Sequence, residues 1–383
     1  MLSSQRELFD MPREVTYLNA ASWSPLPLAT QEAGRAAVAR KGQPWKLDPS
    51  LAQRQHDRAR AAAARLINAD PADIALISSV GYGVATAAKI LTIPAGSRVL
   101  VLENDHSSPV LEWMTRAPSQ GFTVEVVPQP VEGDWTAAVL QAIERKGVPP
   151  LALASISSVH WSDGGMIDLG SVAAVLRRQG AALLVDATHH AGVLKTDVRS
   201  FDPDFLIFPT YKWVLGPYGR AFIYIAKRRQ EGVPLEQTSY SRRSISSESA
   251  PYVKDMAYAT GARRFDMGER DHFISMEMAS IGMEMMGEWG QEAVTGRLRH
   301  LTQRLADGLR NSGARMHDAR VRAPHILSLG FPSGSVPEGL IERLAAEQVY
   351  VAPRLGRIRI SPHVYNDEAD VDRFIEAFHR LAR

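Results

Sequence analysis

The chain has 383 residues, of which 45% are hydrophobic and 22% are charged. This globular composition excludes a mainly disordered or collagen-like chain, and the length allows two domains. The 44 basic and 42 acidic side chains leave a formal charge of +2, which is no footprint of nucleic-acid binding, and the absence of cysteine excludes disulfides and thiolate metal sites.

Short apolar segments alternate with helical patterns over much of the first 225 residues. Helices are predicted at residues 51–67, 81–91, 135–145 and 169–179. Strands are predicted at residues 74–78, 98–103, 122–127, 151–159, 181–186, 205–208 and 221–225. Because strands that alternate with helices form βαβ units, we expect an α/β fold with a mostly parallel sheet and helices on both faces.

The pattern changes after residue 227. A serine-rich polar loop at residues 239–249 precedes long helices at 273–289 and 292–311. Short strands at 325–329, 349–352 and 357–360 then alternate with helices at 338–347 and 368–382. We therefore expect an N-terminal segment (1–20) that packs near the small domain, a large domain (21–260) and a smaller C-terminal α/β domain (261–383).

Neither a membrane helix nor a signal peptide is predicted. No segment approaches the roughly 18 apolar residues of a membrane span. The first 14 residues contain several charged side chains and lack the apolar stretch of a signal peptide. We therefore expect a cytoplasmic protein with no membrane partner.

Two side chains at predicted strand ends carry the main chemical signal. Asp186 ends the apolar segment LLVD, and Lys212 follows the apolar segment FLIF. Ligands bind at the carboxyl ends of parallel strands, and a lysine after a buried strand can become a nucleophilic amine by desolvation. An acid and a lysine placed in this way can hold a flat cofactor such as pyridoxal phosphate between them.

Four segments add a second signal, which comes from their order along the chain. They are YLNAA at residues 17–21, DATH at 186–189, TYKWVLGPYG at 210–219 and RISPHVYN at 359–366. Together they resemble the class V aminotransferase superfamily of fold-type I enzymes that depend on pyridoxal phosphate. That group includes cysteine desulfurases, isopenicillin N epimerase-like proteins and kynureninases.

The resemblance implies a role for each residue near the cofactor. Lys212 would form the Schiff base and then carry the α-proton. Asp186 would keep the pyridine nitrogen protonated. His189 would face the phenolic oxygen, and His106 would stack on the ring, unless the register there shifts to one of the serines at 107 and 108.

Phosphate and substrate contacts also follow from the resemblance. Backbone amides of Gly81 and Tyr82 would hold the phosphate with help from Thr210, although the family often has two threonines in place of Gly81 and Tyr82. Trp161 is a second departure, since many relatives carry asparagine there. Arg359 would bind the substrate carboxylate, and the pocket for a small amino acid or amine would be lined by Asn19 and Ala21.

The resemblance further implies a homodimer and an aminotransferase as the first choice of activity. A lyase that catalyses β-elimination and an amino-acid epimerase are the alternatives, together with a catalytically silent pyridoxal-phosphate-binding regulator. A persulfide-forming cysteine desulfurase is excluded because the chain has no cysteine to accept sulfur.

A dinucleotide site is the competing cofactor hypothesis. Gly81 and Gly83 follow a predicted strand and open a helix, and Glu103 ends the next strand, as in a glycine-rich dinucleotide fingerprint. Thr86 stands where the third glycine is needed for close packing of helix on strand. That hypothesis also leaves Asp186 and Lys212 without a role.

Overall fold

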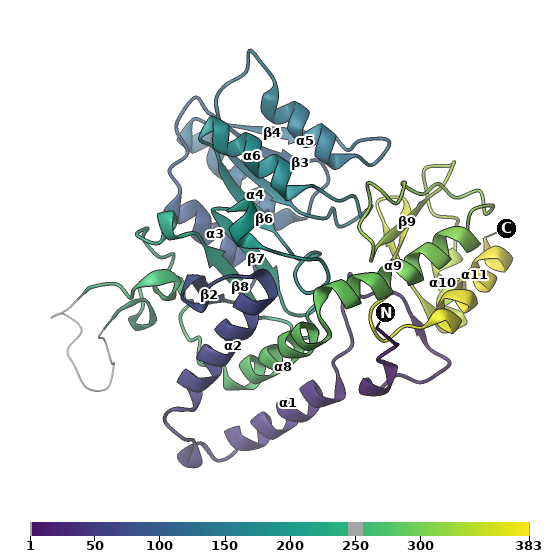
Figure 1. The fold of residues 1–383 in the computed structure, drawn as a ribbon, viewed down its shortest axis with the longest axis horizontal. Coiled ribbons are helices and arrows are strands. Elements are labelled where there is room, and N and C mark those ends of the chain that lie inside the picture. The colour runs from purple at the N-terminus through teal and green to yellow at the C-terminus, as the bar shows by residue number, and fades with distance from the viewer. Residues whose placement is uncertain (1, 244–255, 383) are drawn as a thin grey trace.

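The computed structural model describes residues 2–243 and 256–382 (Figure 1). Its central seven-stranded sheet has the order β2-β8-β7-β6-β5-β3-β4. The strands are β2 (Ile74–Ile77), β3 (Arg98–Leu102), β4 (Thr123–Val127), β5 (Leu151–Ser157), β6 (Ala182–Asp186), β7 (Phe205–Pro209) and β8 (Ala221–Ile225). Only β8 runs against its neighbours β2 and β7, so the predicted mostly parallel sheet is confirmed.

Helices cover both faces of this sheet. On one face, α3 (Val80–Ile90) and α4 (Ser107–Gln120) enclose an apolar cluster with residues such as Val99, Leu184 and Ile207. On the other face, residues such as Leu100, Val185 and Phe208 pack under the helices α2 (Leu51–Ile67), α5 (Trp135–Glu144), α6 (Leu169–Gln179) and α7 (Val198–Phe201). The strands are buried on both sides, which explains why they read as continuous apolar segments.

The C-terminal part forms a smaller α/β unit, at the yellow end of the ribbon (Figure 1). Its sheet has the order β11-β12-β9. The elements are α9 (Gln291–Gly308), β9 (Leu327–Gly330), α10 (Leu340–Ala346), β10 (Val349–Tyr350), β11 (Ala352–Arg354), β12 (Arg357–Ile360) and α11 (Glu368–Leu381). Near the N-terminus, β1 (Thr16–Tyr17) pairs with β10 in parallel. The division of the chain into domains at residues 20 and 260 stays a prediction.

Three α-helices were not predicted from the sequence: α1 (Leu28–Lys41), α4 and the four-residue α7. The α1 sequence is rich in alanine and lacks a continuous apolar stripe, because it packs closely on α8 (Phe273–Trp289) through small residues such as Gly34, which contacts Met278. Proline at position 118 obscured α4, which buries Val110 and Trp113. Residues 244–249 of the predicted serine-rich loop lie outside the described residues.

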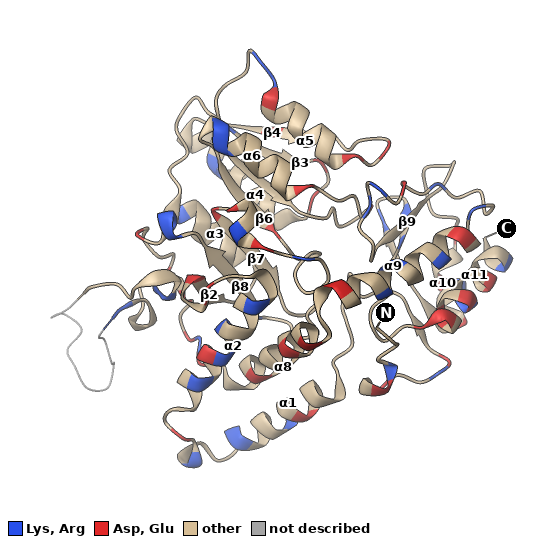
Figure 2. Ribbon diagram, in the orientation of Figure 1, with Lys and Arg blue, Asp and Glu red and all other residues tan. Residues whose placement is uncertain are grey.

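Charges of both signs are interspersed along the outer helices (Figure 2). Arg58 on α2, for example, forms ion pairs with Glu277 and Glu284 on α8. No helix within residues 2–243 and 256–382 is long and apolar enough to cross a membrane.

The open edge of β2 is covered by the segment that follows residue 256. The carboxylate of Asp266 accepts a hydrogen bond from the Leu76 amide at 2.9 Å, and the Met267 amide donates to the Leu76 carbonyl at 2.9 Å. Asp266 also pairs with Arg60 and Arg270, and both Asp266 and Arg60 are buried. The segment thus satisfies an edge that would otherwise expose unpaired backbone groups.

We expect Asp266→Ala to lower the free energy of unfolding by about 3–5 kcal/mol, because the substitution leaves the buried Arg60 guanidinium without a counter-charge. Asp271→Ala removes a half-exposed carboxylate close by and should cost less than about 1 kcal/mol. Urea denaturation of both variants measures the difference. Equal, small effects would show that the buried pair does not hold this segment.

Candidate active site

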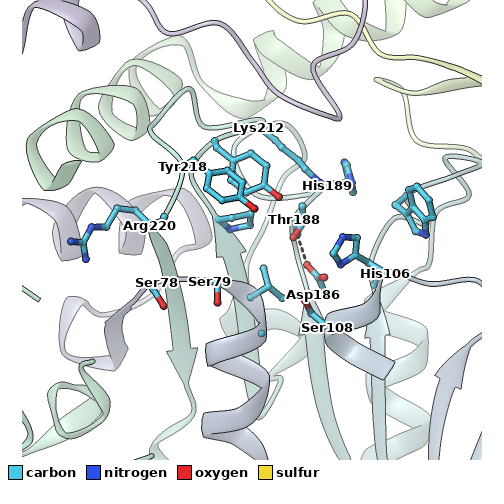
Figure 3. Close-up of a pocket in the computed structure, with 17 residues that line it drawn as sticks. Ser78, Ser79, His106, Ser108, Asp186, Thr188, His189, Lys212, Tyr218 and Arg220 are labelled. Atoms are coloured by element: carbon cyan, nitrogen blue, oxygen red, sulfur yellow. Dashed lines mark hydrogen bonds between the residues drawn. The ribbon is translucent and has the colours of Figure 1, made fainter. Parts of the chain in front are cut away.

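A cavity opens at the carboxyl ends of β5, β6 and β7, where a parallel sheet presents its ligand-binding edge (Figure 3). Asp186, the last residue of β6, lies at its floor. The residues that line the cavity are Ser78, Ser79, Val80, Gly81, His106, Ser108, Ser157, Trp161, Asp186, Thr188, His189, Pro209, Tyr211, Lys212, Tyr218, Gly219 and Arg220.

Lys212 enters the cavity from the loop after β7. The loop is closed by Thr210, whose hydroxyl donates to the Pro217 carbonyl at 2.5 Å and whose carbonyl accepts from the Gly216 amide at 2.8 Å. A side chain at Gly216 would collide with the Thr210 Cβ, 2.7 Å away. Thr210 is fully buried and does not line the cavity, so its expected contact with the phosphate stays a prediction.

The Lys212 amine is held in a form that can react. Its pKa is lowered to about 7, mainly by burial and also by the positive charge of Arg359, while Asp186 opposes the change. The amine therefore loses its proton near neutral pH, well below the usual range of a lysine. An uncharged amine is a nucleophile and a proton acceptor.

His189 contacts this amine through a fixed nitrogen. The Trp213 indole N–H donates to His189 Nδ1 at 2.9 Å, so the ring proton sits on Nε2. His189 Nε2 lies 3.4 Å from Lys212 Nζ. Burial holds the pKa of His189 well below its ordinary value, and the neighbouring Lys212 adds to the effect. His189 is therefore a neutral donor that faces the reactive amine.

The Asp186 carboxylate has one oxygen tied to the protein. Its Oδ1 accepts from the Thr188 amide at 2.9 Å, as the dashed line in Figure 3 marks. His106 lies beside Asp186 and comes from the residue before α4 (Figure 3). The His106 amide donates to Asp105 at 2.7 Å, and the Asp105 carboxylate also accepts from the Ser157 hydroxyl at 2.7 Å. This chain of contacts fixes His106 above the carboxyl end of the sheet.

An anion-binding end is formed by the N-terminus of α3. Ser79 caps this helix by accepting from the Tyr82 amide at 3.1 Å, and the exposed first turn contains Gly81. Backbone N–H groups at such a terminus attract an anion. A Cβ at Gly81 would point at the hydroxyls of Ser108 and Ser79, 3.8 and 3.9 Å away. The Tyr82 amide donates to the Ser79 cap, and the Tyr82 side chain does not line the cavity.

Arg359 lies in an adjoining pocket on the far side of Lys212. Its guanidinium is buried and donates to the Trp161 carbonyl and to the Ser22 hydroxyl, each at 2.7 Å. Ala21 lines this pocket. Asn19 does not line it but accepts from the Ser22 hydroxyl at 2.7 Å. The predicted residues thus gather around two connected spaces, with Lys212 at the junction.

These residues fit pyridoxal phosphate. The cavity holds a buried amine for the carbonyl carbon, a carboxylate for the pyridine nitrogen and a neutral N–H donor for the phenolic oxygen. The helix terminus at Gly81 supplies unfilled space and N–H groups for a phosphate. Within the described residues, no cluster of side chains suited to a metal ion is present.

Comparisons with known proteins agree with this donor set. A family model described as aminotransferase class V matches residues 48–374. The chain belongs to the class V aminotransferase family. Pyridoxal phosphate is the cofactor of this family, so the predicted cofactor and family are confirmed.

Individual relatives differ in the reaction that their names give. The chain is 27% identical to the uncharacterized aminotransferase YcbU of Bacillus subtilis (strain 168), over 97% of this chain and 95% of the relative. It is 26% identical to isopenicillin N epimerase of Streptomyces clavuligerus, over 96% and 95% of the two chains. The solved complex of the cystine C-S lyase C-DES with cysteine persulfide superposes with a TM-score of 0.85 at 20% identity, over 97% and 99%. The last likeness establishes the fold-type I architecture alone.

Sequence reasoning about this class V enzyme missed several residues of the site. The sequence analysis gave Trp213 no role beyond being the neighbour of Lys212. A buried indole N–H needs a hydrogen-bond acceptor, and this could have pointed to a contact with His189. Arg220 follows the glycine-rich loop directly and lines the anion end. Ser22 and Arg354 join Arg359 in the second pocket, and nothing in the local sequence brings these two together.

We expect Gly81→Ala to weaken the binding of pyridoxal phosphate by about tenfold to a hundredfold, because the methyl group occupies space that a phosphate needs. The stability of the cofactor-free protein should not fall, since alanine favours a helix more than glycine does. Gly296→Ala in α9 has open space around it and serves as the control. Equilibrium titration with the cofactor gives both affinities, and an unchanged affinity in Gly81→Ala would place the phosphate elsewhere.

Binding of pyridoxal phosphate to the cofactor-free protein should accelerate as the pH rises through about 7, because Lys212 then loses its proton. Above that pH the rate should level off rather than climb toward the usual lysine pKa. Arg359→Gln should move the midpoint upward, since Arg359 helps to lower the pKa of Lys212. Stopped-flow absorbance measures the rates, and a rise that continues to pH 10 would show a fully protonated lysine at neutrality.

Proposed function

We propose that the chain is an aminotransferase that moves the amino group of an α-amino acid, acting as a homodimer. The observation that carries the proposal is the position of Lys212, whose amine can lose its proton near neutral pH, between the cavity at the sheet edge and the pocket that holds Arg359. Full-length similarity to a relative named as an aminotransferase supports the choice of reaction.

The substrate would be oriented by its carboxylate. Arg359 presents a planar guanidinium at the side of the pocket away from the anion end, and guanidinium and carboxylate form paired hydrogen bonds. The α-carbon would then lie near Lys212, which lines both spaces. Burial of Arg359 excludes water and strengthens this contact.

Lys212 would carry the proton that leaves and returns at the α-carbon. Its neutral amine accepts the proton, and its position at the junction of the two pockets lets it return that proton to a different carbon. Bound pyridoxal phosphate supplies the electron sink for this transfer. Asp186 would hold a proton on the pyridine nitrogen, and His189 Nε2–H would donate to the phenolic oxygen.

A homodimer is proposed from the mouth of the site. Trp23 and Tyr218 stack with ring centroids 5.1 Å apart, yet they are 59% and 63% exposed. Large aromatic side chains left open beside a reactive centre favour cover by a second copy of the chain. Light scattering of the purified protein should give twice the mass of the chain, and a monomer mass would contradict the proposal.

The reaction itself is tested with the holoenzyme and an amino acid but no oxo acid. We expect one equivalent of oxo acid per subunit and then a stop, until a second oxo acid is added. Lys212→Ala should slow this release by about a hundredfold to ten-thousandfold, because it removes the proton carrier. Lys195→Ala removes an exposed lysine and should leave the rate unchanged.

Other outcomes assign other reactions. Continuous release of ammonia would replace the proposal with a lyase. Inversion of the configuration at the α-carbon without release of oxo acid would replace it with an epimerase. Undiminished turnover in Lys212→Ala would refute a role for this amine altogether.

A further inference from the structure

A second guanidinium lies in the substrate pocket beside Arg359. Arg354, at the end of β11, donates to the Ser22 hydroxyl at 2.7 Å, the same oxygen that accepts from Arg359 at 2.7 Å. Its guanidinium lies 5.8 Å from the centre of the Trp161 ring. Both arginines line the pocket that adjoins Lys212, and both influence the pKa of that amine.

Neither arginine forms an ion pair with an acidic side chain in residues 2–243 and 256–382. In the part of the chain that the structure describes, the recorded partners of Arg354 are the carbonyl of Pro353 and the hydroxyl of Ser22. Arg359 likewise meets only a carbonyl and that hydroxyl, and its buried Nε has no partner. Among the residues that the structure describes, no acidic side chain lines the pocket. Burial, with Arg354 beside it, lowers the pKa of Arg359, as expected for two like charges in a confined space.

The turn next to Arg354 contains a residue with an unfavourable backbone conformation. Arg354 pairs with Arg357 across a two-residue turn at Leu355 and Gly356. Both turn residues have positive φ, +47° and +77°, although leucine disfavours this region. Leu355 is 56% exposed and lines the pocket rather than the core. The turn therefore places an arginine and an apolar side chain at the substrate entrance.

Two unpaired cations exceed what one α-carboxylate needs. A single guanidinium already satisfies a carboxylate through two parallel hydrogen bonds. A substrate with one negative charge would leave the second cation in the pocket without a counter-charge, which is unfavourable in a partly buried site. A substrate with two carboxylates would balance both.

We propose, on the basis of the function proposed above, that the substrate is an acidic amino acid, with Arg359 holding one carboxylate and Arg354 the other. The Ser22 hydroxyl, which is neutral, would then hold the two guanidinium groups in place without supplying a counter-charge. Trp161 would help to position both arginines, because its ring faces the Arg354 guanidinium and its carbonyl accepts from Arg359.

The test separates recognition from chemistry by using ligands without an amino group. Calorimetry of the holoenzyme compares glutarate, which has two carboxylates, with pentanoate, which has the same number of carbons and one carboxylate. We expect glutarate to bind about tenfold to a hundredfold more tightly, as charge-assisted hydrogen bonds allow. Arg354→Gln should remove this preference, while its affinity for pentanoate stays close to that of the wild-type protein.

Arg315→Gln is the matched control, because Arg315 is an exposed arginine of the same part of the chain and lies outside the substrate pocket. It should keep the preference for glutarate. In parallel, kcat/KM for glutamate against glutamine and for aspartate against asparagine should favour the acids in the wild-type protein and in Arg315→Gln only.

Two results would overturn the inference. Equal affinity of the wild-type protein for glutarate and pentanoate would show that no second carboxylate is recognised. An equal loss of both affinities in Arg354→Gln would show that the two arginines share one carboxylate. Failure of the proposed function is a separate result, since an enzyme that forms no oxo acid can still be scored for its glutarate preference.

Discussion

The site depends on a buried lysine amine that can lose its proton near neutral pH. Burial alone favours the neutral form of Lys212, and the positive charge of Arg359 adds to it. Asp186 pulls in the opposite direction, so the pKa settles near neutrality instead of falling further. His189 offers this amine an N–H rather than a lone pair, because Trp213 occupies its other nitrogen. The surrounding groups thus allow the amine to lose and regain a proton near neutral pH.

Two buried histidines next to the strands of the small sheet contact the segments that carry His189 and Trp213. His325 contacts the His189 carbonyl at 2.8 Å, and His363 contacts the Trp213 carbonyl at 3.2 Å. Burial lowers the pKa of His325 to about 3 and that of His363 to about 4, so both rings are neutral at neutral pH. The C-terminal elements therefore position the reactive lysine without adding positive charge next to it.

Charge is sorted along the two connected pockets. The anion end at α3 combines backbone amides with Arg220, the middle holds the carboxylate of Asp186, and the substrate side carries Arg354 and Arg359. The substrate side is assembled from distant parts of the chain, since Ser22 directly follows the N-terminal segment (1–20) and both arginines lie near the C-terminus. That segment is tied to the small sheet through β1 and through Ser361, whose carbonyl accepts from the Ala20 amide at 3.0 Å.

Sequence patterns located all seven strands of the central sheet, because strands buried on both faces must be apolar throughout. They missed α1 and α4, in which small residues and an internal proline hide the helical period, and α7, which is too short to show a period. They also led to Asp186, Lys212 and Arg359, since strand ends and family motifs mark these positions. The Thr210 hydroxyl donates to the Pro217 carbonyl within the lysine loop, and its contact with the phosphate stays a prediction.

By itself, the sequence determined the fold class, the family and the cofactor, because these follow from local periodicity and from motifs in a fixed order. It also excluded a persulfide-forming cysteine by composition. Only the tertiary structure decided the state of the amine, the tautomer of His189 and the meeting of Arg354 with Arg359 over Ser22. These are properties of groups brought together from distant positions, and a pKa or an unpaired charge exists only once its neighbours are in place.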